Sequence, residues 1–321
     1  MRCIVEHLAL LRDALPALPF VLLVGTGCAS NAGTEDSGRL TVVTTTSMIA
    51  DLAAQLGGEH VDATGLMGPG VDPHLYKASA GDVGRMGGAD VILYNGFHLE
   101  GKMTDVFDQM KGRGIPTFAV AEESISEDRL IESEQFSGNY DPHVWFDVEM
   151  WQDVARRTAE ALAEMDPEHA DAYEERLETY LDEMEDVDAY VRRRTAEIPE
   201  DKRVVVTSHD AFGYLGRAYG FDVRGLQGIS TATEAGTADV QQLAAFVAER
   251  RIPALFVETS VSPRGIEAVR QAVRSRGFEV SIGGTLYGDA LGEPGTPAGT
   301  YLGMMRENID TIVSSLTRPT S

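Results

Sequence analysis

Residues 166–199 have the sequence DPEHADAYEERLETYLDEMEDVDAYVRRRTAEIP, and this segment predicts the longest helix of the chain. Asp166, Pro167 and Glu168 predict an N-cap, a proline at the first helical position and an acid in the first turn. Apolar side chains then recur at helical spacing as far as Pro199, at Tyr173, Leu177, Tyr180, Leu181, Met184, Val187, Tyr190 and Val191. About 30 residues at ~1.5 Å per residue would run the length of a lobe.

On both sides of this helix, short β-branched runs alternate with helical patterns, which is typical of parallel strands joined by crossover helices. Before the helix, strands are expected at residues 40–45, 61–67, 91–94 and 116–120. After it, strands are expected at residues 203–207, 254–257 and 279–282. Further helices are expected to start near Asp210, Thr237, Pro263 and Thr300. The sequence thus predicts an α/β fold of two lobes, each with a mostly parallel sheet flanked by helices, joined by one long rigid α-helix.

The N-terminal segment has the pattern of an export signal. Arg2 and Arg12 precede an apolar stretch, residues 14–24, that is too short to span a bilayer and is typical of a signal peptide. Small residues then lead into Cys28, which is followed by a polar segment. This order resembles a bacterial lipoprotein cleavage site with Cys28 as the lipidated residue, and plain secretion is the alternative.

The expected division of the chain follows from these patterns. It comprises a signal peptide (1–27), a lipoprotein tether (28–39), an N-terminal α/β lobe (40–165), the linking helix (166–198) and a C-terminal α/β lobe (199–321). The protein is expected outside the cytoplasm, anchored to the membrane through Cys28, and monomeric.

The composition argues against several classes of partner. The 321 residues include 51 acids and 27 bases, for a formal net charge of −24. That charge would repel phosphate backbones and anionic lipid headgroups, which argues against nucleic-acid binding and polybasic membrane docking. The only cysteines are Cys3 and Cys28. The body of the chain therefore has no internal disulfide and no thiolate metal site.

The tripeptide Asp-Pro-His occurs twice, ending at His74 and at His143, in a chain with seven histidines. Proline fixes its own φ and favours an extended preceding residue, so each histidine is expected on a stiff loop. His74 follows the strand expected at 61–67. His143 follows the strand expected at 116–120 after an irregular acidic loop, residues 121–140. Both would lie beyond the C-terminal ends of strands, where open α/β sheets bind ligands.

The second lobe offers two matching groups. His209 comes just after the strand expected at 203–207, and Asp289 comes after the strand expected at 279–282. Two ligands from each lobe predict one cation between the lobes. Three imidazoles and one carboxylate suit zinc or manganese, whereas calcium and magnesium would favour oxygen ligands alone.

The other candidates are weaker. His60 and His169 fall at expected helix ends and His7 falls in the signal segment, so these are interpreted as bystanders. His98 also follows a strand, but it would have to displace a better placed ligand. Glu258 ends an expected strand and is interpreted as a helix-cap partner in preference to a residue that supports a metal ligand.

These motifs resemble the cluster A-I, or TroA-like, solute-binding proteins of ABC importers, which bind zinc, manganese or iron. The resemblance lies in residues 44–51, 70–76, 94–96, 99–101, 141–147, 207–212 and 286–291 and spans nearly the whole mature chain. It implies two α/β lobes, one long rigid helix, an ABC permease with its ATPase as partners, and no enzymatic activity. The positions that match the family's metal ligands are His74, His143, His209 and Asp289.

The resemblance leaves the identity of the metal open. Manganese binders of the family often have glutamate at the third ligand position and zinc binders have histidine, so His209 favours zinc or members that take both. Zinc-specific members often carry a histidine-rich loop before the second ligand, but residues 121–140 contain six acids and no histidine. Zinc and manganese are the expected cargo, with iron as a further candidate.

Other classes of protein could share some of these features. A zinc metallohydrolase could use the same ligands together with a water, but four protein ligands leave little room for a substrate. Glu258 would be its only candidate general base. Residues 96–102 have the spacing of a phosphate-binding loop, but Met103 lacks the hydroxyl that binds magnesium and Glu100 would repel phosphate. A surface adhesin on the same fold is a further alternative.

Overall fold

The computed structural model describes residues 38–133 and 140–318. The first lobe contains four parallel strands in the order β2-β1-β3-β4, namely β1 (Leu40–Thr44), β2 (Val61–Gly65), β3 (Val91–Tyr94) and β4 (Thr117–Ala119). Val42 on β1 pairs with Ala63 on β2 and with Val91 on β3. Parallel neighbours need crossover connections. Here they are α1 (Ser47–Gly57), α2 (Ala80–Met86) and α3 (Thr104–Gly112).

The second lobe contains two parallel strand pairs. They are β5 (Val204–His209) with β6 (Asp222–Gln227), and β7 (Ala254–Glu258) with β8 (Ser281–Leu286). Strand β5 also lies beside β7, so the two pairs are neighbours. The connecting helices are α7 (Gly213–Tyr219), α8 (Thr237–Arg250) and α9 (Arg264–Arg274), and α10 (Tyr301–Leu316) packs on β8. The predicted α/β fold with parallel sheets is confirmed.

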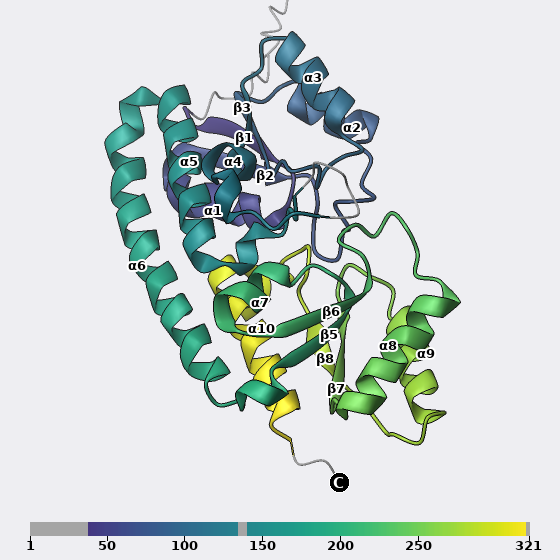
Figure 1. Cartoon of the computed structure of the whole chain (residues 1–321). Coiled ribbons are helices and arrows are strands. Elements are labelled where there is room, and N and C mark those ends of the chain that lie inside the picture. The colour runs from purple at the N-terminus through teal and green to yellow at the C-terminus, as the bar shows by residue number, and fades with distance from the viewer. Residues whose placement is uncertain (1–37, 134–139, 319–321) are drawn as a thin grey trace, which may run out of the picture. The chain divides into compact units, whose positions relative to one another are not determined.

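Helix α6 (Ala170–Thr195) runs along one side of the molecule, past the strands of both lobes (Figure 1). Its 26 residues correspond to about 39 Å. The buried side chains of α6 are Tyr173, Leu177, Tyr180, Met184, Val187, Val191 and Thr195. The helix packs against α1 and α5 (Val148–Met165) of the first lobe and against α10 of the second. The predicted long helix between the lobes is therefore present and contacts both of them.

The start of α6 differs from the prediction. A 3₁₀ turn, Pro167–His169, precedes the helix, and the Asp166 side chain makes no cap hydrogen bond. The Tyr173 hydroxyl instead donates to Asp166 at 2.6 Å, and Nδ1 of His169 lies 2.8 Å from the same carboxylate. The His169 ring stacks on His60 with centroids 3.9 Å apart. These two histidines, interpreted as bystanders, thus join the first lobe to the start of α6.

Strand β8 starts two residues later than the predicted strand at 279–282 and ends four residues later, at Leu286. Gly283 and Gly284 lie inside the strand. A Cβ on Gly283 would lie 2.8 Å from Phe256 and from Ser315, and a Cβ on Gly284 would lie 2.6 Å from Thr311. Ser315 and Thr311 belong to α10. The glycines therefore allow α10 to approach the strand closely.

Two further elements were missed. Strand β6 has the sequence DVRGLQ and only Leu226 in it is buried, so it lacks the alternation of apolar and polar residues that marks a strand. The segment expected as an irregular loop at 121–140 begins with helix α4 (Val120–Ser124), where Val120 and Ala121 enter the core.

The N-terminal expectations fall largely outside the described residues. The signal peptide, nearly all of the tether and Cys28 belong to residues 1–37, which the structure does not describe. Within residues 38–133 and 140–318, no helix has both the length and the apolar character needed to cross a membrane.

Candidate metal site

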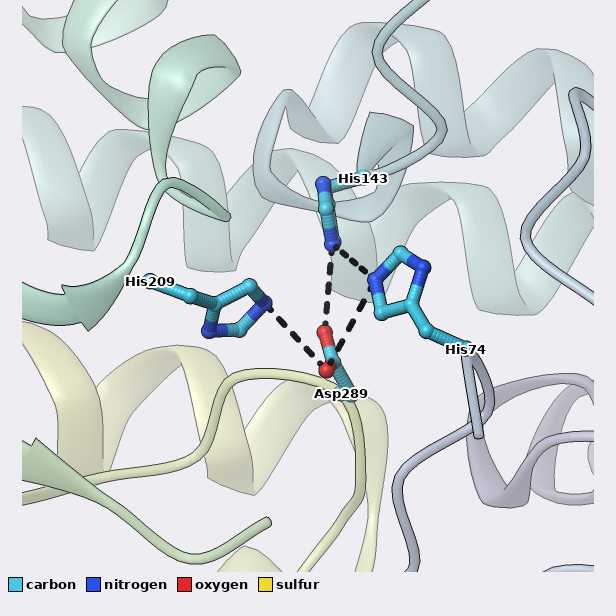
Figure 2. A group of neighbouring side chains, drawn as sticks. All are labelled: His74, His143, His209 and Asp289. Atoms are coloured by element: carbon cyan, nitrogen blue, oxygen red, sulfur yellow. Dashed lines mark hydrogen bonds and ion pairs between the residues drawn. The ribbon is translucent and has the colours of Figure 1, made fainter. Parts of the chain in front are cut away.

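Four buried side chains converge between the two lobes (Figure 2). His74 lies on the loop after β2, and His143 directly precedes a 3₁₀ turn, Val144–Phe146, that leads into α5. His209 is the last residue of β5, and Asp289 follows β8. Their candidate ligand atoms all lie within 4.8 Å of one another. The structure thus brings together the four residues that the sequence singled out.

The distances between these atoms fit a small coordination shell. Nε2 of His143 lies 3.3 Å from Nε2 of His74 and 3.2 Å from Oδ1 of Asp289. Oδ2 of Asp289 lies 3.3 Å from Nε2 of His209 and 4.0 Å from Nε2 of His74. Ligands about 2.0–2.1 Å from a tetrahedral ion are separated by roughly 3.3–3.4 Å. The arrangement can therefore hold one ion of that size with modest adjustment at His74.

The repeated Asp-Pro-His motif has a structural reason. In each copy the aspartate accepts the backbone N–H of the histidine two residues later, from His74 to Asp72 at 2.9 Å and from His143 to Asp141 at 3.0 Å. The intervening proline has no N–H and fixes its own φ, so the turn is rigid. Each copy of the motif therefore forms the same short, rigid turn and holds its histidine at the end of that turn.

Two of the three imidazoles have a carboxylate beside their Nδ1 atom. Asp141 lies 2.7 Å from Nδ1 of His143, and Glu258 lies 2.7 Å from Nδ1 of His209. Glu258 also accepts the backbone N–H of His209 at 2.9 Å. Contacts of this kind hold Nδ1 and direct Nε2 of the same ring towards an ion. The interpretation of Glu258 as a helix-cap partner was wrong: because β7 lies beside β5, the end of β7 places Glu258 against the ligand at the end of β5.

The loop that carries Asp289 is held by the first lobe. The Trp145 indole N–H donates to the Gly288 carbonyl at 3.1 Å, and the Leu291 N–H donates to the Ser47 hydroxyl at 2.8 Å. The Tyr301 N–H, at the start of α10, donates to Asp51 at 2.8 Å. The position of Asp289 therefore depends on contacts with both lobes.

The electrostatics of the site couple its protons to ion binding. Burial lowers the pKa of His74 to about 3, against the opposing effect of Asp289. Burial also disfavours charge on His143, but Asp141 and Asp289 outweigh it and raise its pKa to about 9. The same balance, with Asp289 and Glu258 as the acids, raises the pKa of His209 well above its usual value. Burial would raise the pKa of Asp289, but the two facing imidazoles hold it well below its usual value.

The donor set fits a divalent transition metal. Both carboxylate oxygens of Asp289 and Nε2 of His209 are buried and make no hydrogen bond within the described residues. Buried polar atoms of this kind usually have a partner. Imidazole nitrogen with one carboxylate oxygen is a donor set that transition metals prefer to calcium or magnesium. An ion at the centre would supply the missing partner to all three atoms.

The weaker candidates lie elsewhere. His98 is exposed and lines a cavity that His74 also borders, while His60 and His169 stack on each other beside α6. His7 falls outside the described residues. The phosphate-loop alternative finds no support, because the N–H groups of Asn95 and Gly96 donate to the buried Glu100 carboxylate at 2.9 and 3.2 Å.

Comparison with known proteins assigns the chain to a family. The model of the ZnuA family, described as zinc-uptake complex component A, periplasmic, matches residues 42–315. Because the match covers most of the chain, the protein belongs to this family of metal-uptake binding proteins. The family resemblance inferred from the motifs is confirmed, and the hydrolase alternative is not supported.

Individual relatives are similar over nearly their whole length. The zinc-binding protein TroA of Treponema pallidum is 46% identical over 312 residues, which cover 96% of this chain and 100% of the relative. The manganese-binding lipoprotein MntA of Bacillus subtilis is 46% identical over 303 residues, which cover 94% of this chain and 98% of the relative. The solved structure of TroA from Treponema pallidum superposes with a TM-score of 0.85 at 49% identity, covering 88% of this chain and all of that one.

Proposed function

We propose that this protein is the extracytoplasmic solute-binding component of an ABC importer, which captures one divalent transition-metal ion and delivers it to the permease. The ion is bound by His74, His143, His209 and Asp289. The observation that carries the proposal is the convergence of these four buried side chains between two lobes that a long helix connects. Membership of a family of uptake proteins supports the transport role.

The proposed cargo is zinc or manganese. The two relatives with the highest identity quoted above are named for zinc and for manganese, and each is 46% identical to this chain. Three imidazoles favour zinc, and the carboxylate is also suited to manganese. Elemental analysis of protein purified without added metal, followed by competition between Zn²⁺ and Mn²⁺, decides between the two ions.

The organisation that goes with this function has three parts. We infer an N-terminal lobe of residues 40–165, a linking segment of residues 166–198 and a C-terminal lobe of residues 199–321. We further infer that the protein works as a monomer with a permease and its ATPase. Relatives named as lipoproteins support an anchor at Cys28, which mass spectrometry of the membrane fraction would test.

Calorimetry of the purified protein tests the site. The wild type is expected to bind one Zn²⁺ or Mn²⁺ per chain. Removing a direct ligand by His143→Ala is expected to lower affinity by more than about 100-fold, the upper end of what an outer-shell change costs. His169→Ala, which removes a histidine beside α6, is the matched control and is expected to bind as the wild type does. Unchanged binding by the His143→Ala protein would remove this assignment.

A further inference from the structure

A cavity opens onto the proposed site at His74, and we call it the mouth of the site. Of the four proposed ligands, only His74 borders a cavity of about 230 Å³ that lies between segments of the two lobes. The first lobe contributes Phe97 and Tyr140 to its wall, and the loop after β6 contributes Ile229, Ser230 and Ala232. The other three ligands are at most 1% exposed. Within the described residues, the mouth therefore lies over His74.

One side chain anchors the loop that covers this mouth. Thr231 is the only buried residue between Leu226 and Leu243, and its neighbours Ala232 and Thr233 are exposed. Its hydroxyl donates to Oδ2 of Asp72 at 2.6 Å, a contact between the two lobes across 159 positions of sequence. A buried polar side chain needs a hydrogen-bond partner, and for Thr231 this carboxylate is the partner.

The same carboxylate also holds a proposed ligand. Oδ1 of Asp72 accepts the backbone N–H of His74, while Oδ2 accepts the Thr231 hydroxyl. The other copy of the motif differs, because Asp141 contacts the backbone and ring of its own histidine. Asp72 therefore links the position of His74 to the position of a loop in the opposite lobe.

The hydrogen bond between Thr231 and Asp72 lies far from the helix that joins the two lobes. The loop between β6 and α8 lies on the side of the molecule opposite α6 (Figure 1). Helix α6 packs against elements of both lobes. Any movement of the lobes about α6 would be largest on the far side, so a hydrogen bond there would be broken early in such a movement.

We propose that the hydrogen bond between Thr231 and Asp72 is a latch that holds the 228–236 loop over the mouth and sets the rate at which the ion leaves. The proposal rests on the proposed function, because it assumes an ion at the four-residue site. Thr231 and Asp72 act as positioning residues and do not bind the ion. The latch acts on the closed state alone, so it changes the release of the ion and leaves the fold of the metal-free lobes intact.

Thr231→Val tests the latch because it removes the hydroxyl and keeps the shape. The protein is loaded with Zn²⁺ and mixed rapidly with excess chelator, and the release rate is measured. Loss of a hydrogen bond to a charged group is expected to accelerate release by about 10- to 100-fold. Thr231→Ser, which restores the hydroxyl, should release at the wild-type rate. Thr233→Val, an exposed neighbour in the same loop, is the matched control.

The outcomes separate the latch from simpler explanations. Faster release by Thr231→Val, rescue by Thr231→Ser and an unchanged Tm of the metal-free protein support it. Release at the wild-type rate by Thr231→Val overturns it, and so does acceleration that Thr231→Ser fails to rescue or that comes with a lowered Tm of the metal-free protein. If the wild type binds zinc normally, such a result leaves the proposed function standing. Failure of the wild type to bind zinc or manganese overturns both proposals.

Discussion

Replacing Glu258 with glutamine should weaken ion binding although Glu258 is not itself a proposed ligand. Its carboxylate lies 2.7 Å from Nδ1 of His209, and neither side chain is exposed. Glutamine has the same shape but carries no charge, and one of its two terminal groups is a donor that would face another donor. Loss of an outer-shell carboxylate lowers metal affinity by about 10- to 100-fold, or about 1.4–2.7 kcal/mol.

A second effect of the same change runs in the opposite direction. Glu258 helps to raise the pKa of His209, so without it less free energy is needed to remove the proton before an ion binds. This gain is present at neutral pH, where His209 carries its proton, and disappears as alkaline pH removes that proton in the wild type as well. The loss of affinity in the Glu258→Gln protein should therefore grow as the pH rises from neutral through the pKa of His209.

Chelator-competition titrations over a series of pH values from neutral to alkaline measure both effects. Glu279→Gln is the control, because the Glu279 carboxylate is 77% exposed and its ion pair within the described residues is with an exposed arginine, Arg274. Affinities of the Glu258→Gln protein within twofold of wild type across the whole series would refute the orienting role of Glu258. A loss that stays the same from neutral pH to a pH at which His209 has lost its proton would refute the expected effect of that proton.

Two other predictions follow from the same geometry. Binding at pH 7 should release about two protons per ion, because His143 with its pKa of about 9 and His209 with its raised pKa must both be neutral to bind. Calorimetry in buffers of different ionisation enthalpy counts them, and a count near zero would contradict the raised values. Gly288→Ala should lower affinity about tenfold or more, because the new Cβ would lie 2.4 Å from the Glu258 carboxylate. Gly112→Ala, whose Cβ would meet nothing within 4 Å, should bind normally in the same titration.

The raised pKa of His143 also determines how pH affects the stability of the metal-free protein. A histidine whose pKa is raised on folding stabilises the metal-free protein fully below its unfolded value near 6.5, and that contribution is lost as pH rises through the folded value. For His143 the loss is expected between about pH 6.5 and about pH 9. Ion binding has the opposite pH dependence, because the ion binds only the neutral ring.

Much of the site could be predicted from sequence because its residues follow local rules. The Asp-Pro-His turns are made by contacts two residues apart, and the ends of parallel strands place His209 and Asp289 at one edge. The contact of Glu258 with His209 could not be predicted, because it depends on β5 and β7 being neighbours. No local sequence pattern indicates that they are. The partnership of Thr231 with Asp72 spans 159 positions and left no signal in the sequence.

The strands also divide into those that their own sequence predicts and those that depend on tertiary contacts. Buried strands such as β3 and β5 have continuous β-branched or apolar runs and were found. Strand β6 was missed because its neighbours, and not its own composition, make it a strand. The glycines in β8 are required by the close approach of α10, a tertiary contact that the local sequence does not indicate, so the predicted strand ended at residue 282.

Only two of the three imidazoles are held by a carboxylate, and this difference predicts the order in which their bonds to the ion break. His143 and His209 are each braced at Nδ1 by a carboxylate, but within the described residues no carboxylate lies against Nδ1 of His74. His74 is also the ligand at the mouth. We expect its bond to exchange first, with water taking its place, while the two braced rings and Asp289 still hold the ion. The ion would then leave stepwise from the His74 side. A receiving site on the importer would therefore need to place its first donor atom on that side alone.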